Sequence, residues 1–387
     1  MSVHRCLFPC LLSIACLSAC ADRSIPPPTA KNDPASTPGS TDTSANPKST
    51  TDPQPSADPA DPPAAVEALT ALDAKFKRDG DGHIVEVDLR GTSVSDDDLQ
   101  RIPELPRVRS VLLAETAITD EGLKSLGKQP ALRSLDLRDC SITNSGLESL
   151  AGLTELRALK FSNKSGNSGG VDSGGMPHLA GMKHLKALAL DYLWVDEEGL
   201  GKLSELKDLE ELYLANTLIE DLTVLQQFPK LKKLRLANTR VSSEGLAALQ
   251  PLEQLSELDL SENAVLSDDA MTQLAPLKQL TRLNLWRVPI TDAGMPPLAG
   301  LTKLQWLNLD NTSITDAGLE YLAGLKELTF LHLGSTPVTD AGLVHLEGLT
   351  KLKDLKVTRT AVTAAGVAEL QKQLPNTKIQ LEYLGDG

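Results

Sequence analysis

The stretch LQWLNLDNTSITDAGLEYLAGLKE, residues 304–327, determines the fold of most of this chain. The next 24 residues, LTFLHLGSTPVTDAGLVHLEGLTK (328–351), repeat its apolar pattern, and so do the 24 residues before it, LTRLNLWRVPITDAGMPPLAGLTK (280–303). A fixed period with a fixed apolar pattern indicates stacked equivalent units rather than one globular core. Because one unit buries its leucines only against its neighbours, about three or more units are needed for stability.

Each unit is predicted to begin with a short strand that leads into a bend. Leu307 and Leu309 alternate along the chain, which places both side chains on one face of a strand. Thr312 and Ile314 are expected to continue inward after the chain bends.

A short helix is predicted to complete the unit. Thr315 or Asp316 can cap its first turn. Its apolar residues recur at every third position: Leu319, Leu322 and Leu325. Gly324 suits a left-handed turn that ends the helix.

Twelve such units are predicted in residues 84–375. Their first apolar residues are Ile84, Val108, Leu132, Leu156, Leu185, Leu209, Leu231, Leu255, Leu280, Leu304, Leu328 and Leu352. Most intervals are 24 residues, but the unit that begins at Leu209 has 22 and lacks the Gly-Leu pair of the helix start, and a unit of 25 has an extra residue near Val265. The unit of 29 contains SGNSGG (165–170), which is predicted to form a loop extruded from one unit.

The segment before the repeats is predicted to cap the first unit. Residues 64–78, AAVEALTALDAKFKR, follow two prolines and predict a helix that covers leucines otherwise exposed to water. Residues 79–84, DGDGHI, resemble part of a calcium-binding EF-hand loop. However, a loop aligned on Gly82 would begin with Lys77, a cation where a carboxylate ligand is required. We therefore predict a turn here, and residues 64–83 form the N-terminal cap.

The segment after the repeats is predicted to close the other end. Ile379 and Leu381 fall at strand positions in the same register. Residues 376–387 are therefore predicted to be a capping strand and tail, with Tyr383 and Leu384 covering the last unit.

The first 19 residues predict a signal peptide. Residues 6–17 form an apolar run that is too short to span a bilayer as a stable helix. The run ends in LSAC (17–20), which resembles the lipobox of bacterial lipoproteins, where the signal is cut before the cysteine and the thiol is lipidated. The resemblance implies lipidation of Cys20. An ordinary signal peptide cut near Ala19 or Ala21 is the alternative.

Residues 20–63 are predicted to be a lipidated cysteine followed by a disordered tether. Eleven of the 43 residues in 21–63 are proline and Ile25 is the single large apolar residue, so nothing offsets the entropy of ordering. The tether spans roughly 35 Å as a coil and about 130 Å as extended polyproline. By the lipoprotein resemblance, Ala21 rather than Asp after Cys20 favours the outer membrane in some bacteria. The predicted location is the bacterial cell envelope, lipid-anchored at the outer membrane or at the periplasmic face of a membrane.

The cysteines and the net charge narrow the function classes. Cys6, Cys10 and Cys16 leave with the signal, and their spacing over an apolar run fits no zinc pattern. Only Cys140 then remains beside the lipidated Cys20, so no intrachain disulfide is expected. The formal net charge of −14 repels nucleic acid and anionic lipid. No metal and no cofactor is predicted.

The pattern LxxLxLxxT, followed by I/V-T-D-x-G-L-x-x-L, resembles the leucine-rich repeat family. It is most similar to the ribonuclease-inhibitor-like and cysteine-containing classes and to repeat lipoproteins of planctomycetes and related bacteria, and it covers residues 84–384. The resemblance implies an α/β solenoid, a horseshoe with a concave parallel sheet and convex short helices. The 22-residue unit resembles the internalin type. The family also includes eukaryotic ubiquitin-ligase receptors, but those carry an F-box where this chain has a signal, a tether and a cap.

One position departs consistently from the family pattern. The usual Asn or Cys after LxxLxL is mostly Thr here: Thr92, Thr116, Thr217, Thr239, Thr312, Thr336 and Thr360. Cys140 and Asn263 are exceptions that keep the family residues. A short polar side chain there can satisfy backbone groups at the bend. Leu193 and Val288 cannot, so local distortion of their units is expected.

Catalytic motifs are absent from the sequence after the signal. It contains no phosphate-binding glycine loop, HExxH, GxSxG or cysteine pair. Of the six histidines only His332 is expected on the outward face of a strand, where Asp310 could approach it. An acid and a base without a nucleophile or a pocket do not make an enzyme, so we predict a non-catalytic protein with a hydrolase as a remote alternative.

The concave face of the ninth to eleventh units is the predicted binding site. Register places Arg282, Trp306 and Phe330 side by side, roughly 4.8 Å apart. The predicted ligand-binding residues are Arg282, Asn284, Trp286, Trp306, Asn308, Asp310, Phe330 and His332. Exposed aromatics beside Arg, Asn and His are typical of protein-binding surfaces, so an unidentified protein or peptide ligand of a monomeric scaffold is predicted. The alternatives are a stacked carbohydrate, a column that only stabilises the surface, and a structural or self-associating envelope spacer.

Overall fold

A single sheet of 14 strands, following one another in chain order, runs through the described residues, 59–166 and 170–382, of the computed structural model. The strands are β1 (Lys75–Arg78), β2 (Ile84–Asp88), β3 (Ser110–Leu112), β4 (Ser134–Arg138), β5 (Ala158–Ser162), β6 (Ala187–Asp191), β7 (Glu211–Tyr213), β8 (Lys233–Arg235), β9 (Glu257–Asp259), β10 (Arg282–Asn284), β11 (Trp306–Asn308), β12 (Phe330–His332), β13 (Asp354–Lys356) and β14 (Lys378–Gln380). All neighbouring pairs are parallel except β1 and β2.

Short helices connect the strands. The α-helices are α1 (Pro63–Thr70), α2 (Asp120–Leu126), α3 (Asn144–Leu150), α4 (Glu197–Gly201), α5 (Asp268–Leu274), α6 (Asp316–Leu319) and α7 (Ala364–Gln373). The 3-10 helices are η1 (Asp98–Glu104), η2 (Ser173–Leu179), η3 (Leu222–Gln227), η4 (Glu244–Leu249), η5 (Asp292–Gly294), η6 (Pro296–Gly300), η7 (Glu320–Leu322) and η8 (Gly342–Leu346).

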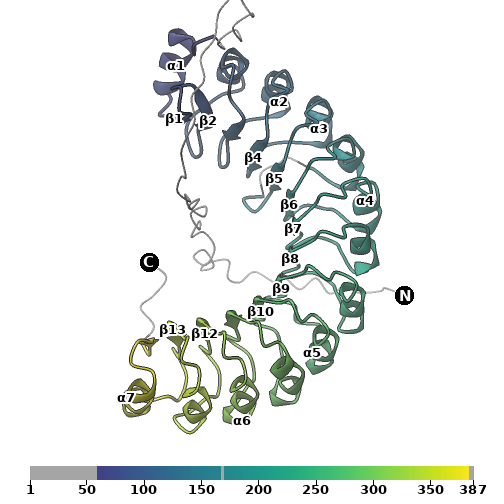
Figure 1. Ribbon diagram of the computed structural model, residues 1–387. Helices are drawn as coiled ribbons and strands as arrows, with labels where there is room; N and C mark the ends of the chain where they lie inside the picture. Colours follow the sequence, from purple (N-terminus) through teal and green to yellow (C-terminus); the bar gives the residue numbers. More distant parts are fainter. Residues whose placement is uncertain (1–58, 167–169, 383–387) are drawn as a thin grey trace, which may run out of the picture. The chain divides into compact units, whose positions relative to one another are not determined.

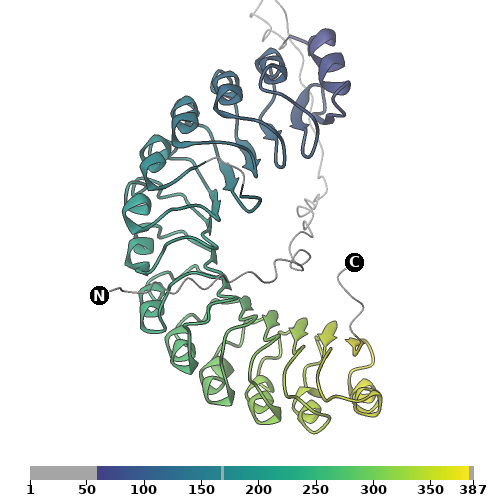
Figure 2. The ribbon, with the colours of Figure 1, turned by 180° about the vertical axis from the view of Figure 1, so that it is seen from behind.

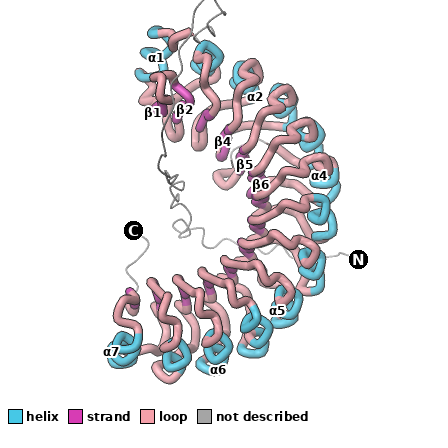
Figure 3. Tube along the Cα trace, viewed as in Figure 1, coloured by secondary structure: helices cyan, strands magenta, loops and turns pink. Residues whose placement is uncertain are grey.

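The strands lie on the inner side of a curved solenoid and the helices on its outer side (Figures 1 and 3). Seen from behind, the same progression runs from the purple α1 end to the yellow α7 end (Figure 2). The predicted α/β solenoid with a concave parallel sheet and convex short helices is thus confirmed. We call each repeat unit a coil and number the coils 1 to 12 in chain order, from the unit at Ile84 to the unit at Leu352.

Equivalent leucines of successive coils stack into one continuous core. Leu307 of β11 lies opposite Leu283 of β10 and Leu331 of β12 in the parallel register. All three are fully buried, and burial of a leucine side chain stabilises a fold by about 1.5–3 kcal/mol. Thr312 and Ile314 are buried as predicted.

The sharp turn of each coil lies at the end of the strand rather than at the end of the helix. Asn311 has a φ of 56°. Positive φ recurs at the same place in other coils, at Gly91, Glu115, Asp139, Tyr192, Asn216, Asn238, Glu262, Arg287, Ser335 and Arg359. The predicted left-handed turn at Gly324 is wrong, because the helical segment of coil 10 ends in a right-handed cap at Ala323.

Polar side chains after this turn satisfy backbone carbonyls, as predicted. Thr312 Oγ1 donates to the carbonyl oxygen of Leu309 over 2.7 Å, and Cys140 Sγ donates to that of Leu113 over 3.1 Å. Asn263 Nδ2 donates to two buried carbonyls, of Leu236 and Leu260.

The coils that have Leu193 and Val288 at this place keep the regular geometry, so the predicted distortion is wrong. Strands β6 and β10 pair in unbroken register on both sides. The left-handed turn is kept by Tyr192 and Arg287, and the Val288 N–H donates to the carbonyl of Leu285 over 3.0 Å. Backbone bonding within and between coils therefore holds the bend without a polar side chain.

The N-terminal cap contains a strand that the sequence pattern did not predict. Helix α1 ends at Thr70 instead of continuing through residue 78, and β1 pairs antiparallel with β2. Ala65 and Leu69 of the helix are fully buried. The first parallel strand would otherwise present an open edge of unpaired backbone groups, which β1 covers.

The segment DGDGHI forms the predicted turn. Asp79 Oδ1 accepts hydrogen bonds from the backbone N–H groups of Asp81 and His83, both over 3.0 Å. Arg107 lies 2.9 Å from the Asp79 carboxylate and 2.7 Å from that of Asp81. Both carboxylates therefore pair with a guanidinium.

Strand β14 continues the parallel sheet at the other end, with Ile379 opposite Leu355. The predicted cover by Tyr383 and Leu384 lies outside the described residues, as do the signal peptide, Cys20 and the tether as far as residue 58. Within the described part of the chain, no helix is long and apolar enough to cross a membrane.

Candidate functional site

The first outward position of the strands β7 to β13 forms one continuous row across the concave face. In register the row is Glu211, Lys233, Glu257, Arg282, Trp306, Phe330 and Asp354. Its charged part alternates in sign and pairs internally. Lys233 Nζ lies 3.1 Å from Glu211 and 3.7 Å from Glu257, and Arg282 Nε lies 3.6 Å from Glu257.

The aromatic part of the row is a stack. The rings of Trp306 and Phe330 are parallel within 5°, with centroids 5.0 Å apart. Arg282 Cζ lies 4.5 Å from the Trp306 centroid, and Lys356 Nζ lies 5.7 Å from the Phe330 centroid. The structure therefore brings together the three residues that the register places side by side.

This stacking decides which part of the aromatic rings a ligand can reach. Arg282 and Phe330 come from the strands on either side of Trp306, so both ring faces of Trp306 are covered. Trp306 and Phe330 are half-buried rather than exposed. A ligand on the concave face meets ring edges, which carry the positive end of the ring quadrupole.

Asparagines occupy the next outward position beside the stack. Asn284 Oδ1 accepts a hydrogen bond from the N–H of Trp286 over 3.2 Å, and Asn308 Oδ1 accepts one from the N–H of Asp310 over 3.0 Å. No described residue accepts a hydrogen bond from the Nδ2 of either asparagine. Two amide donors on adjacent strands are thus available to a ligand.

His332 follows the asparagines in the same column and approaches Asp310, as predicted. His332 Nδ1 lies 4.0 Å from Asp310 Oδ2. Burial lowers the pKa of His332 to about 4 and raises the pKa of Asp310 above its ordinary value. The imidazole is therefore neutral at pH 7, and the contact is not an ion pair. The side chain of Ser335, at the turn after β12, hydrogen-bonds to the Asp310 carboxylate and partly offsets the effect of burial on its pKa. No three His, Cys, Asp or Glu residues of the described ranges cluster to hold a metal.

The third column completes the predicted surface. Arg287 Cζ lies 4.6 Å from the ring centroid of Trp286. Gly334 is buried, and a Cβ there would lie 2.8 Å from His332 Nε2 and 2.9 Å from Asp310 Oδ1. The absence of a side chain at this glycine leaves room for the two polar groups.

A depression of about 180 Å³ adjoins the stack and was missed in part by the sequence analysis. Its lining includes Tyr213, Lys233, Arg235, Glu257, Asp259, Arg282, Asn284 and Trp306. Arg235 lies 3.1 Å from Asp191 and 3.4 Å from Asp259. The polar lining residues that were not predicted occupy the same two columns as the predicted ones, so the register could have identified them. Apart from Tyr213 they are charged residues of frequent types, which drew less attention than the tryptophans.

Comparisons with known proteins agree with this fold. Models described as leucine-rich repeat match residues 278–338 and 129–151. No curated protein matches the sequence.

Three of the similar solved structures are bacterial proteins. An internalin of Listeria monocytogenes is 20% identical with a TM-score of 0.53, over 76% of this chain and 94% of that one. Internalin C2 of the same species is 28% identical with a TM-score of 0.43, over 53% of this chain and 83% of that one. A leucine-rich repeat protein of Leptospira interrogans is 18% identical with a TM-score of 0.44, over 76% of this chain and 89% of that one. These likenesses concern the fold alone.

Proposed function

We propose that this chain, a leucine-rich repeat protein by its sequence pattern and its fold, is a membrane-anchored, non-catalytic scaffold that binds a protein or peptide through the concave face of β10 to β12. The observation that carries the proposal is the Trp306–Phe330 stack, which lies half-buried beside two amide groups with free donors. Aromatic and arginine side chains dominate the binding energy of protein interfaces. Curved solenoids offer their concave face as an extended binding surface.

The polarity of this surface favours a ligand rich in hydrogen-bond acceptors. The Nδ2 groups of Asn284 and Asn308 donate, and the ring edges of Trp306 and Phe330 attract oxygen atoms. A polypeptide laid across the strands presents a backbone carbonyl at every residue. Protein or peptide is therefore a better match than a sugar ring, which stacks on aromatic faces that here are covered.

The remote alternative of a hydrolase lacks support at this site. His332 is neutral at pH 7 and lies beside Asp310, and the Ser335 side chain hydrogen-bonds to the Asp310 carboxylate. A serine nucleophile would need a hydrogen bond to the histidine that acts as its base, and no serine or cysteine among the described residues makes one to His332. Structural spacing by self-association remains the alternative from another class. Native mass measurement of residues 59–387 distinguishes a monomeric binding scaffold from a self-associating spacer. A monomer contradicts self-association, and a stable oligomer supports it.

Membrane anchoring is the second part of the proposal. It rests on LSAC (17–20), which matches a lipobox, and on the proline-rich segment that follows. A lipid on Cys20 and a tether of residues 21–63 would hold the repeats at a bacterial envelope membrane.

The decisive experiment changes the two asparagines to aspartate. Asn284→Asp and Asn308→Asp keep an oxygen that accepts the local backbone N–H but replace the free donors with negative acceptors. Coil 8 shows that the repeat tolerates this residue, since Asp259 Oδ1 accepts from the Ser261 N–H over 3.0 Å. We expect capture of the ligand from envelope extracts to fall at least about tenfold, which corresponds to a loss of about 1.4 kcal/mol of binding free energy. The melting temperature should not change.

Trp306→Ala with Phe330→Ala is the companion variant. Loss of capture in a folded protein supports a binding site. The proposal is wrong if both the aspartate variant and the aromatic variant capture as much ligand as the unchanged protein. If the aromatic variant in addition melts at a lower temperature, the stack only stabilises the surface.

A further inference from the structure

Coil 5 departs from the repeat pattern at three consecutive residues. Tyr192, Leu193 and Trp194 stand where coil 10 has the polar residues 311–313, Asn-Thr-Ser. Trp194 is 70% exposed, more than any other large hydrophobic side chain among the described residues. A side chain so exposed contributes little to the core of the coil.

Tyr192 adds a second departure. Its φ is 62°, a left-handed conformation that is rare for a bulky side chain. Other coils place Gly, Asn, Asp, Glu, Ser or Arg here. The left-handed turn recurs in the other coils, so coil 5 differs only in having a bulky aromatic side chain at a position where they have glycine or a polar residue.

Further apolar side chains follow Trp194 on the same flank of the solenoid. Leu218 occupies the equivalent place in coil 6, half-buried, and its N–H donates to the carbonyl of Val195 over 3.0 Å. Val265 immediately precedes the buried Leu266 of coil 8 and is 63% exposed.

Arg240 holds the equivalent place in coil 7, between Leu218 and Val265, and lies 3.1 Å from Glu220. We call the apolar residues Trp194, Leu218 and Val265 the flank strip, which this ion pair interrupts.

An open, acidic depression lies along this flank next to the strip. It has a volume of about 840 Å³ and is lined by Glu115, Thr116, Ala117, Asp139, Ser141, Lys164 and Ser165. Ser141 holds the place in coil 3 that Trp194 holds in coil 5, and both make the same kind of parallel bridge to the preceding coil. The depression and the flank strip therefore lie on one flank.

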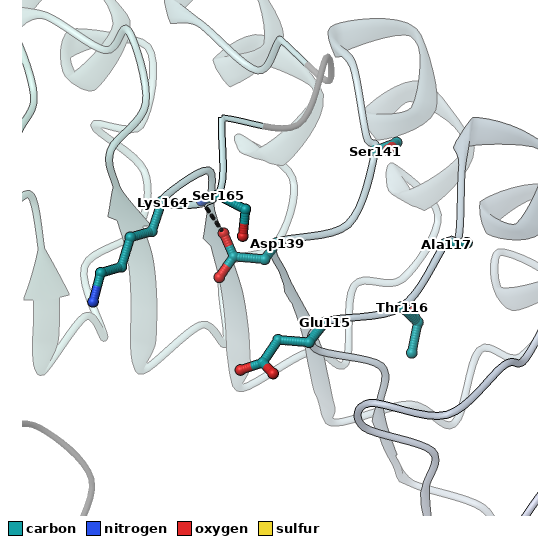
Figure 4. A pocket seen from close by; sticks show the side chains of 7 residues that line it. All are labelled: Glu115, Thr116, Ala117, Asp139, Ser141, Lys164 and Ser165. Carbon is teal, nitrogen blue, oxygen red and sulfur yellow. Dashed lines mark hydrogen bonds between the residues drawn. The ribbon is translucent and has the colours of Figure 1, made fainter. Parts of the chain in front are cut away.

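Two carboxylates and one cation belong to the lining of the depression. Figure 4 shows those of Glu115 and Asp139 on successive coils, directed to the same open side. Asp139 Oδ1 accepts a hydrogen bond from the Ser165 N–H over 3.0 Å. Lys164 is the single cation of the lining, so the formal charge of the lining is negative.

We propose that this flank is a second docking surface, distinct from the concave face, and that it takes an arginine- or lysine-bearing segment of a partner protein. The carboxylates of Glu115 and Asp139 attract the cations of such a segment. With 70% of its surface open, Trp194 offers a ring face for a guanidinium and apolar area for the stem of that side chain. The net charge of −14 adds long-range attraction for a basic partner and repels acidic ones.

The test uses defined peptides rather than an unknown partner. Alternating Arg-Ala, Gln-Ala and Glu-Ala peptides of about twelve residues, about 40 Å when extended, are titrated against residues 20–387 and followed by calorimetry at 0.15 M salt. We expect the Arg-Ala peptide to bind, the Gln-Ala peptide to bind at least about tenfold more weakly, and the Glu-Ala peptide not to bind.

Variants locate the binding. Trp194→Ala should weaken the Arg-Ala peptide about tenfold, and Glu115→Gln should weaken it about threefold. Val344→Ala, which removes another exposed apolar side chain, in η8, is the control and should leave the affinity unchanged. Trp306→Ala tests whether the peptide lies on the concave face instead. Since Trp194 is exposed, its removal leaves the melting temperature unchanged.

Several results would overturn the proposal. The Arg-Ala peptide could fail to bind, or the Gln-Ala peptide could bind equally well. Trp194→Ala could also leave the affinity of the Arg-Ala peptide unchanged, which would indicate diffuse attraction to an acidic protein. A loss caused equally by Trp306→Ala would place the peptide on the concave face instead.

Discussion

The carboxylate of Asp292 accepts two hydrogen bonds from Thr315 of the next coil, from its backbone N–H over 2.8 Å and from its Oγ1 over 2.6 Å. The same pair links other coils: Asp96–Thr119, Asp120–Thr143, Asp268–Thr291, Asp316–Thr339 and Asp340–Thr363. Thr315 Oγ1 also accepts from the Ala317 N–H and so caps its own helix. The Thr-Asp dipeptide of the repeat therefore both starts a helix and connects the coils.

The glycine of the same motif makes room for this connection. A Cβ on Gly318 would overlap the carboxylate of Asp292. We expect Gly318→Ala to lower the free energy of unfolding by about 2 kcal/mol, measured by urea denaturation. Gly324→Ala is the control, because nothing lies within 4 Å of its Cβ position, and it should be neutral or stabilising.

Removal of the carboxylate tests the cause. In an Asp292→Ala background, the additional cost of Gly318→Ala should fall, since the carboxylate is one of the groups that the Cβ would meet. The cost that remains comes from Ile314 Cγ2, which lies 2.7 Å from the Cβ position. Equal costs in both backgrounds would show that the glycine is needed for another reason.

Acid should destabilise the fold through His332. Its folded pKa of about 4 lies below the unfolded value of about 6.5, so the unfolded state binds more protons between these values. This contribution to stability is present above pH 6.5 and is lost as the pH falls towards 4, by up to roughly 3 kcal/mol for a side chain that is only 18% exposed. The measurement is denaturation at several pH values.

The matched variant is His332→Asn, the residue that coils 9 and 10 carry in this column. Its stability should fall less than that of the unchanged protein between pH 6.5 and 4. The raised pKa of Asp310 acts in the opposite direction, with stability lost as the pH rises through that value, but it is present in both proteins. Parallel pH curves for the two would contradict the prediction.

The insertion in coil 4 should be dispensable for folding. Deleting residues 166–170 shortens this coil from 29 to 24 residues and keeps the Ser165 N–H that donates to Asp139. We expect the free energy of unfolding to change by less than about 1 kcal/mol, since loops at the edge of a repeat cost little beyond closure entropy. A loss of more than about 2 kcal/mol would show that these residues pack on the solenoid.

Lipidation at Cys20 predicts a defined mature N-terminus. Mass spectrometry of the N-terminal peptide should find a chain that begins at a modified Cys20, and Cys20→Ser should move the protein from the membrane to the soluble fraction. Cys140→Ser is the control, because that thiol is buried and donates to a backbone carbonyl. An unmodified peptide starting at another residue would contradict the prediction.

The parallel register of the strands allowed much of the candidate site to be predicted from the sequence. Because successive strands are parallel and nearly all coils have similar lengths, residues about 24 apart must lie side by side. This placed Arg282, Trp306 and Phe330 in one row and brought His332 towards Asp310. The leucine core and the threonines at the bend followed from the same periodicity, since a pattern repeated twelve times gives each copy the same environment.

Tertiary structure alone decided features that depend on contacts between coils. The orientation of the Trp306 ring follows from Arg282 and Phe330 on the two neighbouring strands, and it converts a predicted flat aromatic surface into a row of ring edges. The link from Asp292 to Thr315 joins residues of different coils, and the spacing within one repeat contains no sign of it. Strand β1 forms because the assembled sheet has an edge to cover, a condition that no local propensity encodes.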